Sequence, residues 1–154
     1  MKAFLFPLLL FTIAAGCNSE NMNTTHALRL KPGQDLKQSL DSFVRQNKIE
    51  AGWIVTCAGS LTKASIRLAN QPNSSVYEGH FEILSLSGTL SVNGSHLHIS
   101  IADSTGKCIG GHLTNGSVIY TTAEIIIQES DELRFTREKD GTTPWEELQI
   151  HKRK

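Results

Sequence analysis

The chain has 154 residues, of which 39% are hydrophobic and 19% charged, a composition typical of one globular domain with enough apolar surface for a core. Its 15 Lys and Arg residues balance 15 Asp and Glu residues. A net charge of zero gives no electrostatic reason to expect nucleic acid or an anionic membrane surface as a partner, so no nucleic-acid partner is expected.

The N-terminus predicts a signal peptide over residues 1–17. A single lysine precedes an apolar stretch, residues 4–15, which is too short to span a bilayer. Residues 13–17, Ile-Ala-Ala-Gly-Cys, also resemble a bacterial lipobox, in which Cys17 would carry a lipid anchor. We therefore expect an exported protein, either secreted or lipid-anchored. The alternative is translation from Met22, which would leave a cytoplasmic domain.

Residues 18–26 are polar and are interpreted as a linker, so the domain itself is expected to cover residues 27–151. Asp35 is a suitable N-cap for a helix that ends near Asn47. Apolar residues follow this cap at helical spacing, and they predict an amphipathic helix: Leu36, Leu40, Phe43 and Val44.

The rest of the chain predicts antiparallel strands joined by short turns. Asn93-Gly94 predicts a two-residue turn, and residues 103–106 predict the next turn. The expected strands cover residues 51–58, 64–68, 81–92, 95–102, 107–113, 117–128, 133–135 and 148–150. One N-terminal helix followed by many such strands predicts an α+β fold, with the strands in an antiparallel sandwich or meander.

Two cysteines of the domain, Cys57 and Cys108, lie in apolar runs that read as strands. They could form a disulfide in an oxidising compartment, but two buried free thiols are the preferred interpretation. Four sites satisfy the acceptor pattern for N-glycosylation: Asn23, Asn73, Asn93 and Asn115. At the last two, Asn-Gly is also the preferred pair for a tight turn.

Several segments occur in the order and spacing of one family's motifs. They are residues 29–36 (Arg-Leu-Lys-Pro-Gly-Gln-Asp-Leu), 58–61, 66–68, 79–89 (Gly-His-Phe-Glu-Ile-Leu-Ser-Leu-Ser-Gly-Thr), 95–98, 110–113 and 121–124. Together they resemble the plants and prokaryotes conserved (PPC) domain. The resemblance implies an α/β fold around an antiparallel sheet, a homotrimer and a metal site. Plant relatives join this domain to a DNA-binding AT-hook, but no Arg-Gly-Arg-Pro stands in this sequence, so DNA binding does not carry over.

Three histidines carry the one readable chemistry. His96 and His98 are two residues apart in a predicted strand, so their side chains point to the same face. If Ser104-Thr105-Gly106 is a three-residue loop with Gly106 in the left-handed region, His98 lies opposite His112. A two-residue loop would instead send His112 to the other face. In the first register His98 is expected to lie between the other two.

Three imidazoles plus a water form the open geometry of a zinc centre, so His96, His98 and His112 are the predicted ligands of one divalent transition metal, with zinc as the first candidate. Binding needs neutral imidazoles, and the affinity should therefore fall as the pH drops through about 6.5. Neighbouring polar residues are candidates for supporting these ligands, depending on the register: Thr89, Ser91 and Glu124.

Two function classes remain open. The first is a trimeric metal-binding assembly module without turnover, which we favour because no residue stands out as a general base. The second is a zinc-dependent enzyme resembling a hydrolase; its catalytic residues are unknown and no organic cofactor is indicated. A DNA-associated protein is the third and least favoured reading. Arg67 and Glu82 are interpreted as a buried ion pair or as trimer contacts, and Trp145 as a packing residue.

Overall fold

The computed structural model describes residues 23–153. The predicted signal peptide, the lipobox cysteine Cys17 and the alternative start Met22 therefore lie outside the described residues. The elements are β1 (Thr24–Leu30), α1 (Leu36–Asn47), β2 (Gly52–Arg67), β3 (Ser75–Ser91), β4 (Gly94–Ala102), β5 (Cys108–Leu113), β6 (Val118–Glu129), β7 (Leu133–Glu138) and β8 (Glu147–Lys152). Between residues 23 and 153 the structure contains no helix long and apolar enough to cross a membrane.

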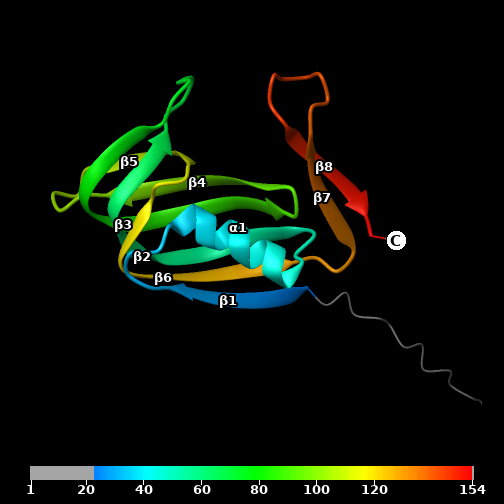
Figure 1. The fold of residues 1–154 in the computed structure, drawn as a ribbon, viewed down its shortest axis with the longest axis horizontal. Coiled ribbons are helices and arrows are strands. Elements are labelled where there is room, and N and C mark those ends of the chain that lie inside the picture. The colour runs from blue at the N-terminus through cyan, green and yellow to red at the C-terminus, as the bar shows by residue number, and fades with distance from the viewer. Residues whose placement is uncertain (1–22, 154) are drawn as a thin grey trace, which may run out of the picture.

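Six of the strands form one curled antiparallel sheet in the order β1-β6-β2-β3-β4-β5 (Figure 1). Strands β2 to β5 follow one another as the predicted meander, whereas β6 returns to the other side of β2. The far end of β2 also pairs with β5, because Ile66 lies opposite Leu113 and Arg67 opposite His112. This second pairing curls the sheet. The predicted class, α+β with an antiparallel sheet and one N-terminal helix, is confirmed.

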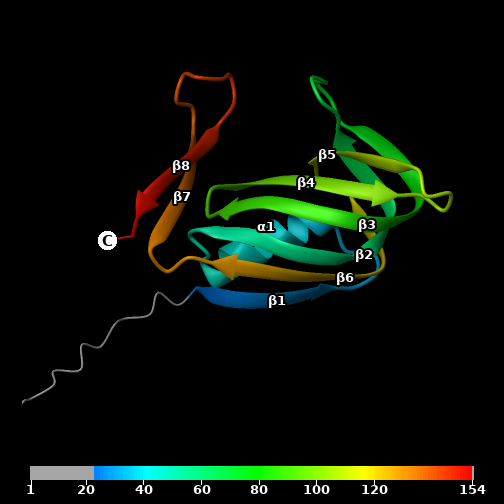
Figure 2. The same cartoon turned by 180° about the vertical axis from the view of Figure 1, so that it is seen from behind.

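Helix α1 packs its apolar side on the curled sheet, as Figures 1 and 2 show from opposite directions. Asp35 is the N-cap, and its side chain accepts a hydrogen bond from the Gln38 backbone N–H at 2.9 Å. The helix ends at Asn47, and Lys48 follows in a left-handed conformation. The predicted apolar stripe supplies three side chains that are almost completely buried: Leu36, Leu40 and Val44.

Strand β4 shows the alternation on which the site depends. Leu97, Ile99 and Ile101 point into the core and are 0%, 3% and 0% exposed. His96 and His98 between them point to the opposite face and are half-buried and exposed, respectively. Burial of each aliphatic side chain contributes roughly 1.5–3 kcal/mol, so a one-residue slip of this strand would be strongly unfavourable.

Several boundaries differ from those the sequence predicted, and strand β3 begins at Ser75, well before the predicted residue 81. Strand β1 begins at Thr24, so the last residues of the segment interpreted as a linker pair with β6. The segments 51–58 and 64–68 belong to one continuous strand, because register shifts on either side of Leu61 bend β2 without ending its pairing. The β3–β4 turn consists of Val92 and Asn93, one residue earlier than predicted, because Ser91 pairs with Gly94.

Two side-chain predictions also need correction. Cys57 is buried, and burial raises the pKa of its thiol to about 11, but Cys108 is exposed, and both thiols are free. Cys108 begins β5 directly after an exposed turn, which keeps it at the surface. Glu82 is exposed, and no ion pair joins it to Arg67 within residues 23–153. Arg67 is therefore a half-buried cation without a carboxylate partner.

The last two strands form a separate two-stranded sheet, the hairpin β7–β8, in which Phe135 pairs with Ile150. This is the closing pair that the sequence predicted, with both strands longer than expected. The hairpin lies beside the β3–β4 turn (Figure 2). Asn93 joins the two parts by a reciprocal pair of hydrogen bonds to the backbone of Arg137, each 3.1 Å long.

Closure of the sheet depends on the absence of a side chain at Gly111. A Cβ atom there would lie 2.7 Å from the carbonyl oxygen of Arg67 and 2.9 Å from the Cγ2 atom of Ile66. Both contacts are too short for real atoms, so β2 could not approach β5 as closely. Gly111 thus permits the pairing that places Arg67 beside His112.

We predict that Gly111→Ala lowers the free energy of unfolding by about 1–3 kcal/mol, the usual cost of forcing extra atoms into a packed interior. Gly110→Ala is the matched control and should cost less, because the added methyl group would lie 3.0 Å from its nearest neighbour, the Ile99 carbonyl oxygen. Chemical denaturation of both variants measures the difference. Equal stabilities would contradict a requirement for glycine at position 111.

Candidate metal centre

The first two histidines are placed by the pairing of β3 with β4. His96 lies opposite Thr89 and His98 opposite Ser87, on the face that points away from the core. Because the apolar residues of β4 are held in the interior, neither imidazole can turn inward without exposing them. The strand alternation therefore presents both rings on one surface.

The third histidine is placed by the turn between β4 and β5. Gly106 has a φ of 81°, and its N–H donates to the carbonyl oxygen of Asp103 at 2.9 Å. The Asp103 carboxylate accepts hydrogen bonds from the Thr105 and Lys107 N–H groups at 2.8 and 3.1 Å. The Asp103 N–H donates to the Lys107 carbonyl oxygen at 3.0 Å, so the loop inside this pair has the three predicted residues, 104–106. The resulting register places His112 opposite His98.

The three imidazoles converge. One ligand atom from each of His96, His98 and His112 lies within 4.8 Å of the other two. The Nε2 atoms of His96 and His98 are 3.3 Å apart. Two nitrogens bound to a tetrahedral zinc ion at about 2.05 Å each are also about 3.3 Å apart. The spacing of this pair therefore matches an edge of the coordination tetrahedron.

The order of the rings differs from the predicted one. The ring centroid of His96 lies 5.0 Å from that of His98 and 4.9 Å from that of His112, whereas His98 and His112 are 5.7 Å apart. His96, and not His98, is therefore the central member. The curl of the sheet carries His112 toward His96, an effect that flat strand register does not include.

The surroundings favour neutral rings. Burial, helped by the neighbouring histidines and by Arg67, lowers the pKa of His112 to about 4. Burial and the Arg137 charge also lower the pKa of His96. The Nδ1 atom of His112 is buried and has no hydrogen-bond partner in residues 23–153. Neutral imidazoles with a free buried nitrogen are the form that metals bind.

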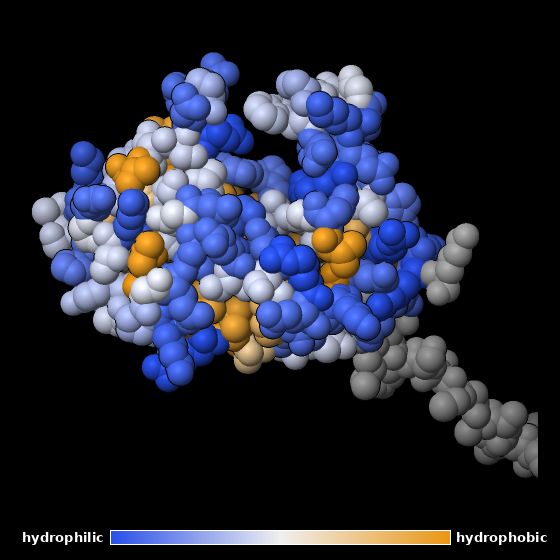
Figure 3. Space-filling model, viewed as in Figure 1, coloured by the Kyte–Doolittle hydropathy of each residue, from blue (hydrophilic) through white to orange (hydrophobic). Residues whose placement is uncertain are grey.

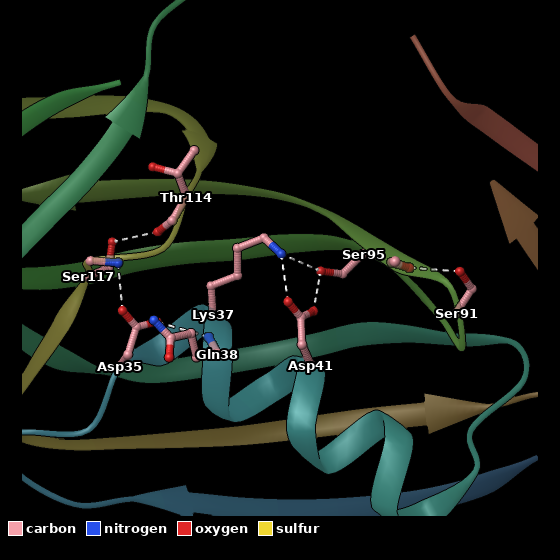
Figure 4. A network of polar contacts seen from close by, with 10 residues as sticks. Asp35, Lys37, Gln38, Asp41, Ser91, Ser95, Thr114 and Ser117 are labelled. Atoms are coloured by element: carbon pink, nitrogen blue, oxygen red, sulfur yellow. Dashed lines mark hydrogen bonds and ion pairs between the residues drawn. The ribbon is translucent and has the colours of Figure 1, made fainter. Parts of the chain in front are cut away.

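A polar cluster secures the start of β4 to the helix, one residue before His96 (Figure 4). The Lys37 ammonium group donates to the Asp41 carboxylate at 2.7 Å and to the Ser95 hydroxyl at 3.1 Å. Ser95 in turn donates to Asp41 at 2.6 Å. This network, which also neutralises the charge of Lys37, limits movement of the strand that carries two of the histidines.

The predicted supporting residues separate in the structure. Thr89 is next to His96 and accepts a hydrogen bond from the Arg137 guanidinium group at 2.7 Å. Ser91 donates to the Gly94 carbonyl within its own turn, at 2.7 Å. Glu124 lies on β6 opposite Ala58, on another part of the sheet. Only Thr89 belongs to the neighbourhood of the histidines.

Sequence reasoning missed Arg137, which reaches this neighbourhood from the C-terminal hairpin. Its sequence neighbours, Thr136 and Glu138, are both polar, so no local pattern marked Arg137 or indicated its partner. Arg137 is 48 residues away from Thr89, and a contact over that separation depends on how the hairpin docks.

The curled antiparallel sheet, the helix α1 packed on it and the convergent histidines define a small α+β domain with a candidate metal centre. The chain belongs to the Plants and Prokaryotes Conserved (PCC, also PPC) domain family, which it matches over residues 17–131. The resemblance seen in the sequence motifs is thereby confirmed.

Individual relatives agree with this assignment. The chain is 48% identical over 127 residues to the bifunctional protein GlmU of a Synechococcus strain, a match that covers 82% of this chain but 20% of GlmU. The chain thus spans about a fifth of that relative's length. A hypothetical protein from Salmonella has the same fold, with 39% identity, a TM-score of 0.84 and coverage of 88% of this chain and 98% of its own.

A second solved structure, a metal-containing protein from Archaeoglobus fulgidus, is 25% identical with a TM-score of 0.70. The similarity covers 82% of this chain and 93% of that protein.

We predict that the metal-free protein loses stability as the pH falls from about 6.5 toward 4. The unfolded chain binds a proton at His112 near the ordinary histidine pKa of about 6.5, whereas the folded chain resists protonation until about pH 4. The contribution of His112 to the free energy of unfolding is therefore fully present above the pKa that this residue has in the unfolded chain, and it declines below that pKa.

Denaturation at several pH values in the presence of a chelator measures this slope. His112→Gln should make the slope shallower over the same interval, because the variant lacks the titrating ring. An identical slope in the variant and the wild type would contradict the assignment to His112.

Proposed function

We propose that this domain is a trimeric metal-binding module in which His96, His98 and His112 bind one divalent transition metal, most readily zinc. The observation that carries the proposal is the convergence of three imidazoles with a 3.3 Å separation between the Nε2 atoms of two of them. The metal-containing relative from Archaeoglobus fulgidus supports the same reading.

The donor set agrees with zinc but does not select it alone. Imidazole nitrogens also suit copper, nickel and iron. Three protein ligands leave a fourth position open, which in zinc proteins is taken by water or by a bound ligand. Because His96 and His112 are only half-buried, the fourth coordination position is accessible from one side.

A zinc-dependent hydrolase would need a general base beside the metal-bound water. Glu147 lines the same pocket as His96 and His112, but it accepts a hydrogen bond from the Thr143 hydroxyl at 2.6 Å. It also stands outside the group of donors that converge on one point. Binding without turnover therefore requires fewer assumptions and is the function we propose.

The histidine assignment predicts one zinc ion per chain in the reloaded protein. His96→Ala, His98→Ala and His112→Ala should each weaken zinc binding by more than the tenfold or so that follows loss of a supporting residue. His96→Ala should have the largest effect, because its ring is nearest to both others.

The measurement is metal content and zinc titration, with circular dichroism to verify folding. His80→Ala is the control, since His80 contacts Tyr120 and is not part of the cluster. The same low metal content in the wild type and all four variants would refute the metal centre.

If the domain is a trimer, light scattering at micromolar concentration should give a mass three times that of one chain. Large apolar side chains are exposed on central strands and support burial between subunits: Val55, Leu84 and Tyr120. Leu84→Lys should shift the mass toward the monomer, whereas Val92→Lys, at the β3–β4 turn, should not. A wild-type monomer would rule out the assembly.

A further inference from the structure

A cavity of about 600 Å³ lies between the hairpin β7–β8 and the strand ends that carry the histidines; we call it the hairpin pocket. Its volume is within the range of small-molecule sites. His96 and His112 line one side, and residues 144–147, from the hairpin loop and the start of β8, line the other. In the space-filling view the molecule is hollowed beside the hairpin, and the hollow is hydrophilic (Figure 3).

The hairpin wall of this pocket is held in place. Phe135 is 6% exposed, and its N–H donates to the Glu50 carbonyl at 2.9 Å. The Asn93 amide bonds in both directions with the backbone of Arg137. The hairpin lies beyond the matched family range, which ends at residue 131. One wall of the pocket therefore comes from residues outside that range.

Arg137 lines the pocket, and only part of its hydrogen-bonding capacity is used within the described chain. It is 9% exposed. Its Nη2 atom donates to the Thr89 hydroxyl at 2.7 Å, but its Nε atom has no partner and no carboxylate forms an ion pair with it in the described chain. The negative charges of Glu146 and Glu147 act on Arg137 without direct contact and do not fully offset the effect of its burial. An anion in contact with the guanidinium group would offset the remaining cost.

Arg67 approaches the same pocket from β2. It pairs in register with His112, and its guanidinium carbon lies 5.4 Å from the centre of the Trp145 ring. Trp145 thus contacts a cation that lines the pocket, in place of the packing role expected from the sequence. No carboxylate within residues 23–153 forms an ion pair with Arg67 either.

The charges around the pocket, the two arginines included, leave a small positive balance. Lys37 is neutralised by Asp41, whereas Lys139 is exposed and adds a cation. Glu146 and Glu147 also line the pocket, and neither forms an ion pair with either arginine. The two arginines therefore keep free donors, and a planar guanidinium group suits the two oxygens of a carboxylate or a phosphate.

We propose that the hairpin pocket binds the oxyanion group of a small organic anion, a carboxylate or a phosphate, through Arg67 and Arg137. The pocket borders the histidines, so a ligand held there lies next to the metal of the proposed function. The arginines are not metal ligands, and the anion site does not require the metal.

The test is calorimetric titration of chelator-treated protein at low ionic strength and pH 7, with inorganic phosphate in one series and succinate in the other. The wild type should bind at least one probe saturably, and the tighter probe identifies the kind of oxyanion. Arg67→Gln and Arg137→Gln should each weaken that binding about tenfold or more, the usual effect of losing a charge-assisted hydrogen bond. Arg137→Lys, which keeps the charge but not the fork, should lie between.

Arg134→Gln is the matched control, because Arg134 is exposed on the same strand and does not line the pocket. Its affinity should equal that of the wild type. Thermal unfolding verifies that each variant is folded. If the substitutions at Arg137 loosen the hairpin, the anion affinity of Arg67→Gln alone tests the proposal. Absence of saturable binding of both probes, or equal binding in all variants, would overturn the proposal.

Zinc content of the same proteins separates this proposal from the metal centre. The two arginine variants should retain zinc, while the histidine variants lose it. If the wild type binds no zinc, the metal proposal fails, and the titrations of chelator-treated protein still decide the anion site.

Discussion

The position of strand β4 is the constraint on which the site depends. Three aliphatic side chains of this strand, Leu97, Ile99 and Ile101, are almost completely buried. A strand with such a buried face cannot shift by one residue without moving all three into water. His96 and His98 are consequently held on the outer face, and the hydrophobic effect, which acts on other residues, orients the candidate ligands.

Curling of the sheet turns this orientation into a site. The end of β2 pairs with β5 as well as β3, and the missing side chain of Gly111 permits the close approach. The curl moves the His112 ring to within 4.9 Å of the His96 ring and places Arg67 beside it. On a flat sheet His112 would meet only its cross-strand neighbour His98. The same backbone pairing therefore gathers the histidines and brings a cation to their edge.

The C-terminal hairpin changes the chemistry of this region. Without the hairpin, the histidines would lie on an open strand face, with no pocket beside them to select a second ligand. The docked hairpin contributes Arg137 and Trp145 and encloses a pocket of about 600 Å³. Because burial disfavours the charged forms of His96, His112 and Arg137 alike, an anion next to a bound cation would reduce the cost for the whole cluster. Metal and anion binding are in this way electrostatically compatible.

The sequence by itself determined the features that depend on local patterns. The N-cap at Asp35 and the two-residue alternation of β4 follow from spacing alone. Convergence of the three histidines followed from the sequence only on the condition that the loop ending at Gly106 has three residues, and the structure meets that condition. Tertiary structure decided the rest. The edge strand β1 is polar and pairs about a hundred residues away, the central place of His96 comes from curvature, and Arg137 reaches Thr89 only because the hairpin docks. Side-chain periodicity reports which face of an element is buried, but contacts between distant elements depend on packing and curvature, which no local pattern encodes.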